Sequence, residues 1–508
     1  MIINAGYILS NPGNPNSIPL RDKGIYIQEG KIIEIGEFST IKKKYREEEI
    51  IGGDNFLAMP GLIDCHSHGR GLSPLRGGVD YDHLELWLSR TSKVPSPGKY
   101  LNSAYSAIKH IKSGITGMVY IHIPPFPTLN SNQLFQDSLA AFQDAGLRLS
   151  AGYSIKDRNF ITYDDQKFLN ELPSSLTQAA SELIPEETDG DLFDRFAREF
   201  KELKNKYEKE NMNIFLAPTG PQWCSKSLME KLTKLALSTD SKVHIHTLQT
   251  VRQKEFGQQL PEGGLLEYMN ETGLLDTDLT LGHAIWLTEK DIELIKSKSV
   301  SITHHAGCNL HLKNGIAPVA NYLSNEVPVA VGLDDKPISE DEDMFQEMRL
   351  INSLHGQNNK ELSGYSLNPA DVLNMATKNG GIIGGLTAYS GKIQKGSAAD
   401  IILIDTNRIK EPWIHPDSDI RTLLFHKGLA KDVQTVIVGG KVIMKNGKIR
   451  TVNENEIKRK FSANLTAEIT KKKKESDIRS DLKPHIRSFY EGWTPDSYEP
   501  YYNVNSKK

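Results

Sequence analysis

The sequence contains little cysteine. Cys65, Cys224 and Cys308 are the only three in 508 residues, too few for the disulfide framework of a small secreted domain. Because they are far apart, the sequence has no Cys-x-x-Cys pair, which excludes a cysteine-based zinc knuckle and the zinc-dependent base deaminases that hold their metal with such a pair. No base can be assigned to these thiols, so we expect them to be reduced and to serve in packing.

An excess of charge of either sign is also missing. The 61 Lys and Arg residues nearly balance the 64 Asp and Glu residues, and the formal net charge is -3. Without a strongly basic field, neither a nucleic acid nor a membrane surface is indicated as a partner, and a small-molecule ligand is expected. The basic run 471–474 has acidic neighbours and is interpreted as a solvated helix face.

Long apolar runs are absent too. No stretch approaches the ~18 apolar residues of a membrane-spanning helix. The opening residues, Met1 to Gly6, lack the basic segment and the cleavage site of a secretory signal peptide. We therefore predict a cytoplasmic protein.

The pattern of apolar residues predicts two kinds of architecture. Short β-rich segments lie near both ends of the chain, so the two ends can pair into one domain. Between them, apolar strands alternate with longer helical stretches, as in parallel β/α units. Eight such strands are predicted, the number that a closed (β/α)8 TIM barrel needs. They lie at 58–66, 117–123, 147–155, 214–218, 242–246, 279–283, 300–304 and 327–334.

These patterns also predict the domain boundaries. We expect residues 57–389 to form the barrel and residues 1–56 and 390–452 to form one composite β domain. Residues 453–508 are expected to form a helical and aromatic C-terminal tail. The segment 157–212 is too long for a simple crossover and predicts an elaborated loop over the barrel mouth.

Polar residues at the ends of the predicted strands are informative, because a barrel of this kind keeps its chemistry there. His66 and His68 end the first strand, and since alternate residues of a strand share a face, both imidazoles point at one place. Histidine or aspartate ends or follows most of the other strands, at His122, His244, His246, His283, His304 and Asp334.

Nitrogen and carboxylate ligands without thiolates suit zinc or ferrous iron, and three imidazoles with one carboxylate leave room for one water. We predict that His66, His68, His246 and Asp334 bind one divalent metal ion, with zinc as the first choice and iron as the alternative. For each residue alone, a structural histidine or a strand-end cap explains the sequence equally well. Four together at strand ends favour a metal site.

Several motifs in register carry a resemblance to a known family. They are PGLIDCHSH at 60–68, VHIHTLQT at 243–250, LGHAIWL at 281–287 and VGLDD at 331–335. Over nearly its whole length, the chain resembles the amidohydrolase superfamily. It is most similar to the branch that contains cytosine, guanine and S-adenosylhomocysteine deaminases and the triazine hydrolases. The resemblance implies an α/β fold in which a TIM barrel carries a small β-sandwich built from both chain ends.

The resemblance also implies a role for each site residue. Asp334 would touch the metal and accept a proton from its water, and His283 would polarise the substrate and steady the attacking water. The implied reaction is hydrolysis of a carbon–nitrogen bond other than a peptide bond by metal-bound hydroxide, most simply in a nitrogen heterocycle or cyclic amidine. Two-metal relatives carry a modified lysine on the fourth strand. Residues 213–218 contain no lysine, so a single ion is expected.

One position departs from that branch. Gln249 lies three residues after His246, where the branch usually has a glutamate that shuttles protons. An amide cannot exchange a proton near neutral pH. Three alternatives follow: His283 and Asp334 carry the protons, the leaving group needs less help, as a halide on a ring does, or the chain is a non-catalytic scaffold or ligand sensor. The intact ligand set favours a working hydrolase, with Gln249 kept as a catalytic candidate.

Substrate contacts are predicted from the loops that follow the third, fourth and seventh strands. The candidates are Arg158, Gln222, Trp223 and Asn309. Loop packing or capping explains each of them equally well. The expected partner is a small heterocyclic molecule, and the sequence does not decide whether the chain forms a homo-oligomer.

Overall fold

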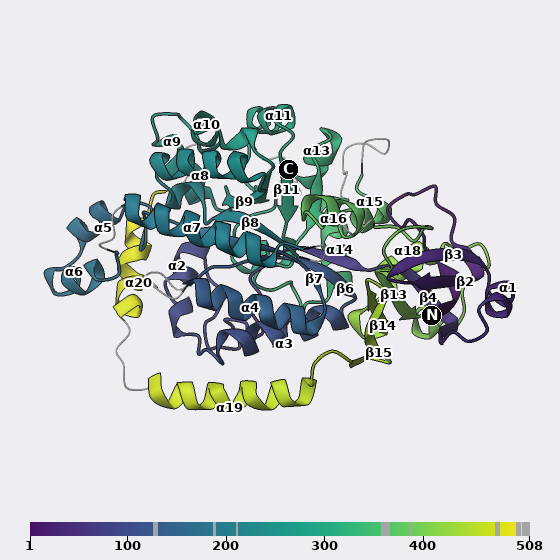
Figure 1. Ribbon diagram of the computed structural model, residues 1–508. Coiled ribbons are helices and arrows are strands. Elements are labelled where there is room, and N and C mark those ends of the chain that lie inside the picture. The colour runs from purple at the N-terminus through teal and green to yellow at the C-terminus, as the bar shows by residue number, and fades with distance from the viewer. Residues whose placement is uncertain are drawn as a thin grey trace.

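The computed structural model describes residues 1–124, 131–185, 189–209, 212–356, 366–386, 389, 391–472, 478–493 and 499. Two eight-stranded sheets organise these residues, one parallel and one mixed (Figure 1). The aromatic residues Tyr501 and Tyr502 of the predicted tail lie outside the described residues.

The parallel sheet is the predicted (β/α)8 barrel. Its strands pair in chain order: β5 (Leu62–Ser67), β6 (Ile115–Ile121), β7 (Arg148–Ile155), β8 (Met212–Pro218), β9 (Val243–Thr247), β10 (Leu279–His283), β11 (Ser301–His304) and β12 (Val329–Val331). The first strand meets the segment after the last one, since Ser67 forms a parallel bridge with Asp334. The Asp334 N–H donates to the His66 carbonyl oxygen at 2.7 Å. The barrel prediction is confirmed.

Helices connect the strands and cover the outside of the barrel (Figure 1). Their starts follow local capping rules: α11 begins at a capping box formed by Thr288 and Asp291, and the Ser225 side chain caps α8. The helices of the barrel region are α2 (Leu84–Leu88), α3 (Lys99–Lys112), α4 (Ser131–Ala145), α8 (Lys226–Thr239), α9 (Val251–Gln258), α10 (Leu265–Glu271), α11 (Glu289–Ser297), α12 (Ala306–His311), α13 (Val319–Ser324), α14 (Met344–His355), α15 (Pro369–Met375) and α16 (Lys378–Ile383).

The long segment after β7, for which an elaborated loop is predicted, contains three helices in the part that the structure describes. They are α5 (Asp165–Glu171), α6 (Ser174–Ser181) and α7 (Asp189–Tyr207). The C-terminal segment adds α19 (Glu454–Lys472) and α20 (Ile478–Phe489), which are yellow in Figure 1. Helix α20 packs against α6 and α2 beside the barrel. No helix among the described residues is long and apolar enough to cross a membrane.

The mixed sheet joins both ends of the chain. Its strands are β1 (Ile2–Ile8), β2 (Leu20–Gln28), β3 (Lys31–Glu37), β4 (Ile50–Pro60), β13 (Ile401–Asp405), β14 (Val433–Val438), β15 (Lys441–Lys445) and β16 (Lys448–Ile449), with α1 (Phe38–Lys44), α17 (Asn407–Lys410) and α18 (Ile420–Lys427) beside them. Strand β4 pairs in parallel with β1 and antiparallel with β13, so the two chain ends meet at the centre of the sheet. This confirms the composite origin of the terminal β domain.

The apolar run before His66 is divided between the two sheets. The sequence predicted a single strand from Ala58 to His66, but β4 ends at Pro60 and β5 begins at Leu62. Gly61 makes the crossing, because a Cβ at this position would lie 2.1 Å from a side-chain carbon of Thr116. An apolar run does not indicate which sheet it enters when both sheets are buried.

A buried ion pair links the two sheets. Arg148, the first residue of β7, donates from Nε to the Asp400 carboxylate at 2.7 Å. Asp400 also accepts a hydrogen bond from the Gly439 N–H at 2.7 Å, next to β14. Because both charged side chains are buried, removal of Arg148 would leave the Asp400 carboxylate without its counter-charge.

Candidate active site

Three of the predicted ligands converge at the carboxyl ends of the barrel strands. His66 belongs to β5, His68 follows it, and His246 belongs to β9. Their ring nitrogens lie within 4.8 Å of one another, and all three side chains are buried. Two side chains from one strand and one from a distant strand therefore form a single group that could hold a metal ion.

Hydrogen bonds at the far side of each ring aim the Nε2 atoms at this group. His68 Nδ1–H donates to the Ile121 carbonyl at 3.0 Å, and His246 Nδ1–H donates to the Thr219 carbonyl at 2.9 Å. In the neutral ring, each Nε2 atom therefore carries a lone pair, the form in which imidazole binds a metal. His66 Nδ1 contacts His244 Nε2 at 2.9 Å, and His66 Nε2 is buried without a hydrogen-bond partner among the described residues.

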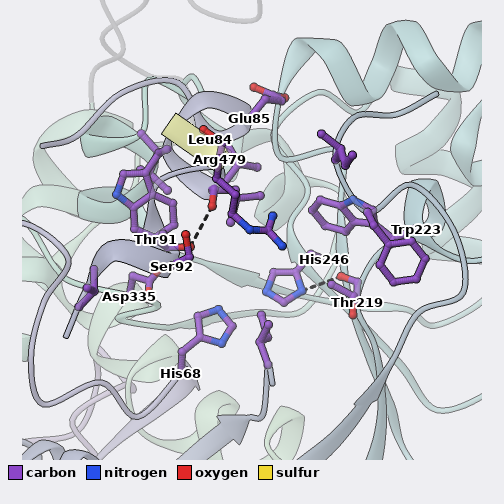
Figure 2. A pocket seen from close by; sticks show the side chains of 18 of the residues that line it. His68, Leu84, Glu85, Thr91, Ser92, Thr219, Trp223, His246, Asp335 and Arg479 are labelled. Carbon is purple, nitrogen blue, oxygen red and sulfur yellow. Dashed lines mark hydrogen bonds between the residues drawn. The ribbon is translucent and has the colours of Figure 1, made fainter. Parts of the chain in front are cut away.

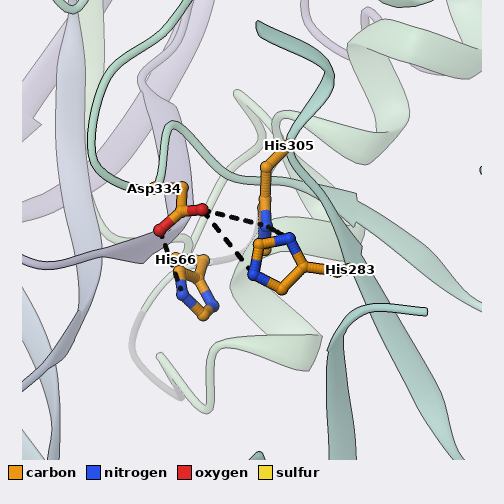
Figure 3. A group of neighbouring side chains, drawn as sticks. All are labelled: His66, His283, His305 and Asp334. Carbon is orange, nitrogen blue, oxygen red and sulfur yellow. Dashed lines mark hydrogen bonds and ion pairs between the residues drawn. The ribbon is translucent and has the colours of Figure 1, made fainter. Parts of the chain in front are cut away.

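Asp334 lies between these ligands and a second pair of histidines (Figure 3). Its Oδ1 atom is 3.1 Å from His68 Nε2 and 3.6 Å from His66 Nε2. Its Oδ2 atom is 3.6 Å from His283 Nε2 and 3.8 Å from His305 Nδ1. The predicted ligand Asp334 and the predicted catalytic His283 are thus brought together with the three histidines.

Burial decides the charge state of most of these rings. It lowers the pKa of His66 well below its usual value, with neighbouring histidines adding to the effect, and lowers the pKa of His246 to about 3. Burial also lowers the pKa of His283, although Asp334 opposes the shift. For His68, burial is outweighed by the hydrogen bond and charge of Asp334, which raise its pKa. His66, His246 and His283 are therefore neutral near pH 7 and can act as ligands or bases.

The backbone at this end of the barrel is held by buried contacts. Asp64 Oδ1 accepts hydrogen bonds from the backbone N–H groups of His66 and Leu333, and Oδ2 lies 2.9 Å from His110 Nε2. His283 and Asp334 have positive φ angles of 70° and 54°. Such left-handed backbone costs roughly 1–3 kcal/mol per residue and persists where the surroundings enforce it, as they often do at functional sites.

His305 is a site residue that the sequence reasoning missed. His304 ends the seventh strand, β11, as predicted, and its Nε2 atom contacts His355 Nε2 at 2.9 Å, outside the ligand group. The adjacent His305 faces the site instead, where its Nδ1 is 3.2 Å from His283 Nδ1. The alternation of faces along a strand was the signal that could have separated the two histidines.

His283 has a defined orientation. His305 Nε2 lies 3.0 Å from Thr303 Oγ1, within hydrogen-bonding distance. Because an amide oxygen only accepts, His283 Nδ1–H donates to Asn309 Oδ1 at 2.9 Å; the same Nδ1 atom lies 3.2 Å from His305 Nδ1. In the neutral ring, His283 Nε2 is therefore an unprotonated atom facing Asp334.

A cavity of about 380 Å³ opens at this cluster, a volume typical of small-molecule sites. Figure 2 shows His68 and His246 facing the same space. His283, Asp334 and Gln249 also line it. Gln249 is 4% exposed, and its backbone N–H donates to Gln253 Oε1 at 2.8 Å.

The predicted substrate residues differ in their placement. Trp223 lines the cavity (Figure 2). Gln222 is fully buried beside it, and Arg158 donates to the Pro221 carbonyl at 3.1 Å. Asn309 holds the His283 ring rather than facing the cavity.

The fold and this cluster together define a metal-dependent hydrolase of the barrel type. Residues 57–443 match the amidohydrolase family, so the chain belongs to this family. The predicted resemblance is confirmed. The predicted enzyme class, an amidohydrolase-superfamily hydrolase that acts on carbon–nitrogen bonds other than peptide bonds, is confirmed as well.

Particular relatives are similar along most of the chain. A 5'-deoxyadenosine deaminase of Methanosphaera stadtmanae is 30% identical over 416 residues, which cover 80% of this chain and 87% of that protein. The 5'-deoxyadenosine deaminase of Methanobrevibacter smithii is 28% identical over 445 residues, with 86% and 91% covered.

Solved structures show the same fold. Atrazine chlorohydrolase TrzN of Arthrobacter aurescens TC1, complexed with zinc, superimposes with a TM-score of 0.75 at 19% identity, covering 91% of this chain and 99% of that one. An adenosine deaminase from Xanthomonas campestris with bound zinc has a TM-score of 0.74 at 21% identity, with 92% and 98% covered.

Proposed function

We propose that this protein is a metal-dependent deaminase that hydrolyses the exocyclic carbon–nitrogen bond of an aminated nitrogen heterocycle and releases ammonia. An adenine nucleoside is the first candidate substrate, because the curated relatives described above are 5'-deoxyadenosine deaminases. The observation that carries the proposal is the convergence of His66, His68, His246 and Asp334 at one end of a cavity of small-molecule size.

We assign one zinc ion to His66, His68, His246 and Asp334. The donors fit such an ion, since buried imidazole Nε2 atoms and a carboxylate oxygen face one another and His66 Nε2 has no hydrogen-bond partner among the described residues. Strand β8, MNIFLAP, has no lysine that could bridge a second ion. Zinc bound here would lower the pKa of a water molecule toward neutrality and so supply the nucleophile.

The residues around the ligands divide the proton transfers between them. The Asp334 carboxylate accepts the proton of the attacking water, since Asp334 lines the cavity and its Oδ2 lies 3.6 Å from His283 Nε2. His283 Nε2 accepts a hydrogen bond from this water and holds it in line with the ring carbon under attack. Asp334 then returns the proton to the departing nitrogen, which leaves as ammonia, so one water is consumed for each amine released.

Gln249 is assigned a positioning role. Its amide can donate and accept hydrogen bonds but cannot transfer a proton, so it orients the heterocycle while Asp334 and His283 move the proton. A second candidate function follows from the same residue. Displacement of a halide from a ring needs no proton at the leaving group, and one structural relative is named as an atrazine chlorohydrolase.

A panel of heterocyclic amines and their halogenated counterparts tests the proposal. The zinc-loaded protein is expected to release ammonia from at least one adenine-type amine, and chelation of the metal is expected to abolish the release. Halide release without ammonia would assign the second function instead. Protein that folds, binds zinc and releases neither product would overturn the proposed chemistry.

A further inference from the structure

The cavity wall carries more positive charge than the net charge of the chain suggests. Four cationic side chains line the cavity, namely Arg70, Lys99, Lys156 and Arg479. Three carboxylates line it as well, namely Glu85, Asp334 and Asp335. A metal ion at the histidine cluster would add two further positive charges to the same space.

Each of these carboxylates already has partners. Asp335 pairs with Arg70 at 3.0 Å, and Asp334 faces the histidines. Glu85 accepts hydrogen bonds from Thr250 at 2.6 Å and from Tyr163 at 3.1 Å. Lys99 has no ion pair with a carboxylate among the described residues, so its charge stands uncompensated at the cavity wall.

The two lysines are held against aromatic rings, each beside an arginine. Lys99 Nζ lies 5.6 Å from the centre of the Tyr120 ring, and burial, with the Arg70 charge, lowers the pKa of Lys99 to about 8. Lys156 Nζ lies 4.6 Å from the Phe160 ring. Burial lowers the pKa of Lys156 to about 8. The charge of Arg479 also lowers this pKa, and the charge of Asp165 raises it. Partly desolvated cations beside other cations favour a bound anion.

Arg479 reaches the cavity from the C-terminal helix α20, which lies beyond the part of the chain that matches the family. Figure 2 shows its guanidinium directed into the cavity toward His246. The helix is attached to the body of the protein: Lys483 pairs with Asp82 at 2.9 Å, and the Tyr490 hydroxyl accepts the Tyr163 N–H at 2.9 Å. This chain therefore adds a cation to the site from a segment outside the family core.

We propose that the substrate carries an anionic group, a carboxylate or a phosphate, which the cations of the cavity wall bind while its aminated ring lies at the histidine cluster. This inference rests on the proposed function and names its substrate class. The guanidinium of Arg479 suits either anion, because its paired N–H groups match two oxygens. A neutral nucleoside would leave the charge of Lys99 without a counter-charge at the cavity wall.

The test compares three adenine compounds that differ only at the 5' position: adenosine, adenosine 5'-monophosphate and adenosine 5'-carboxylic acid. Ammonia release by the full-length zinc enzyme should favour one or both anionic compounds, mainly through a lower KM. Arg479→Gln or Lys99→Gln should lower kcat/KM for the anionic compound by about 10- to 100-fold and for adenosine by less than about threefold. Arg487→Gln is the matched control, since it removes the same charge from the same helix, but Arg487 does not line the cavity.

A binding measurement separates this inference from the proposed function. Inosine and inosine 5'-monophosphate, which have no amino group to lose, are titrated calorimetrically into the same proteins. Tighter binding of the phosphate, weakened by salt and by Arg479→Gln or Lys99→Gln, supports the inference even if no compound releases ammonia. Equal use and equal binding of neutral and anionic compounds, or variants that affect both alike, would overturn it. Whichever anion is preferred identifies the group as phosphate or carboxylate.

Discussion

Replacing Gln249 by glutamate tests how protons move in this site. Gln249 lines the cavity with Asp334 and His283, and the hydrogen bond from its backbone to Gln253 holds the loop in place. A glutamate has the same length and would occupy the same space. Burial and the nearby negative charge of Asp334 would raise the pKa of the new carboxyl group, so a fraction would stay protonated near neutral pH and could donate to the substrate.

The expected increase in rate follows from the general acid that Gln249→Glu would add. A well-placed general acid contributes roughly 10²- to 10⁴-fold to a rate. Because Asp334 and His283 carry the proton in our proposal, we expect the lower end, a rise of about 100-fold in kcat for ammonia release. The buried carboxyl group should also cost about 1–3 kcal/mol of folding stability, because the site offers it fewer partners than water does.

The assay is the steady-state release of ammonia from a compound that the wild-type enzyme already turns over, measured together with zinc content and the urea midpoint of unfolding. Gln249→Met is the matched control, since it keeps the length and removes every polar atom. This variant should raise KM, because the substrate is no longer positioned by the amide. It adds no general acid, so kcat should not rise. If Gln249→Glu folds and keeps its zinc but releases ammonia no faster, proton delivery to the leaving group does not limit the reaction, and our reasoning about this position is wrong.

Three further predictions concern the metal and the scaffold. His66→Ala should lower the metal content from about one ion per chain to near zero by elemental analysis, and an unchanged content would contradict the ligand assignment. Arg148→Met should destabilise the protein by about 3–5 kcal/mol in urea unfolding, because Asp400 is left buried without its charge partner, and adding Asp400→Leu should recover most of the loss. Glu347 is buried, and burial raises its pKa from 4.5 to about 7. The folded state thus holds a proton that the unfolded state releases between these values, and stability falls as the pH rises through this window, by about 3 kcal/mol in total. Glu347→Gln should remove this loss, so the free energy of unfolding of the variant relative to the wild type should grow from pH 4.5 to 7. A difference that stays constant over this range would contradict the raised pKa of Glu347.

The barrel and the ligand types could be predicted from the sequence because both leave local signals. Alternating faces place His66 and His68 together on one strand, and short apolar strands between helical stretches indicate a parallel sheet. Local signals do not predict the structure of the run from Phe56 to Ile63. Its residues are all apolar, and only the close approach of Gly61 to Thr116 places the break between the two sheets.

The orientation of single side chains at the site could not be predicted from the sequence in the same way. Alternation along the strand separates the adjacent His304 and His305, but only the placement of β11 in the barrel decides that His305 is the one that faces Asp334. Asn309 was predicted to contact the substrate, but the fold uses it to orient His283. Both outcomes depend on contacts between loops that follow different strands.

The sequence by itself determined the chemistry available to this protein: imidazole and carboxylate ligands at strand ends, no thiolate ligands, no bridging lysine, and an amide at Gln249. These are properties of residue type and of spacing along one strand. Only the tertiary structure decided which atoms meet. Closure of the barrel places Asp334 beside His66, and the packing of α20 against α6 and α2 brings Arg479 to the cavity. Such contacts join residues hundreds of positions apart, and no local pattern records them, because they arise from how the elements pack.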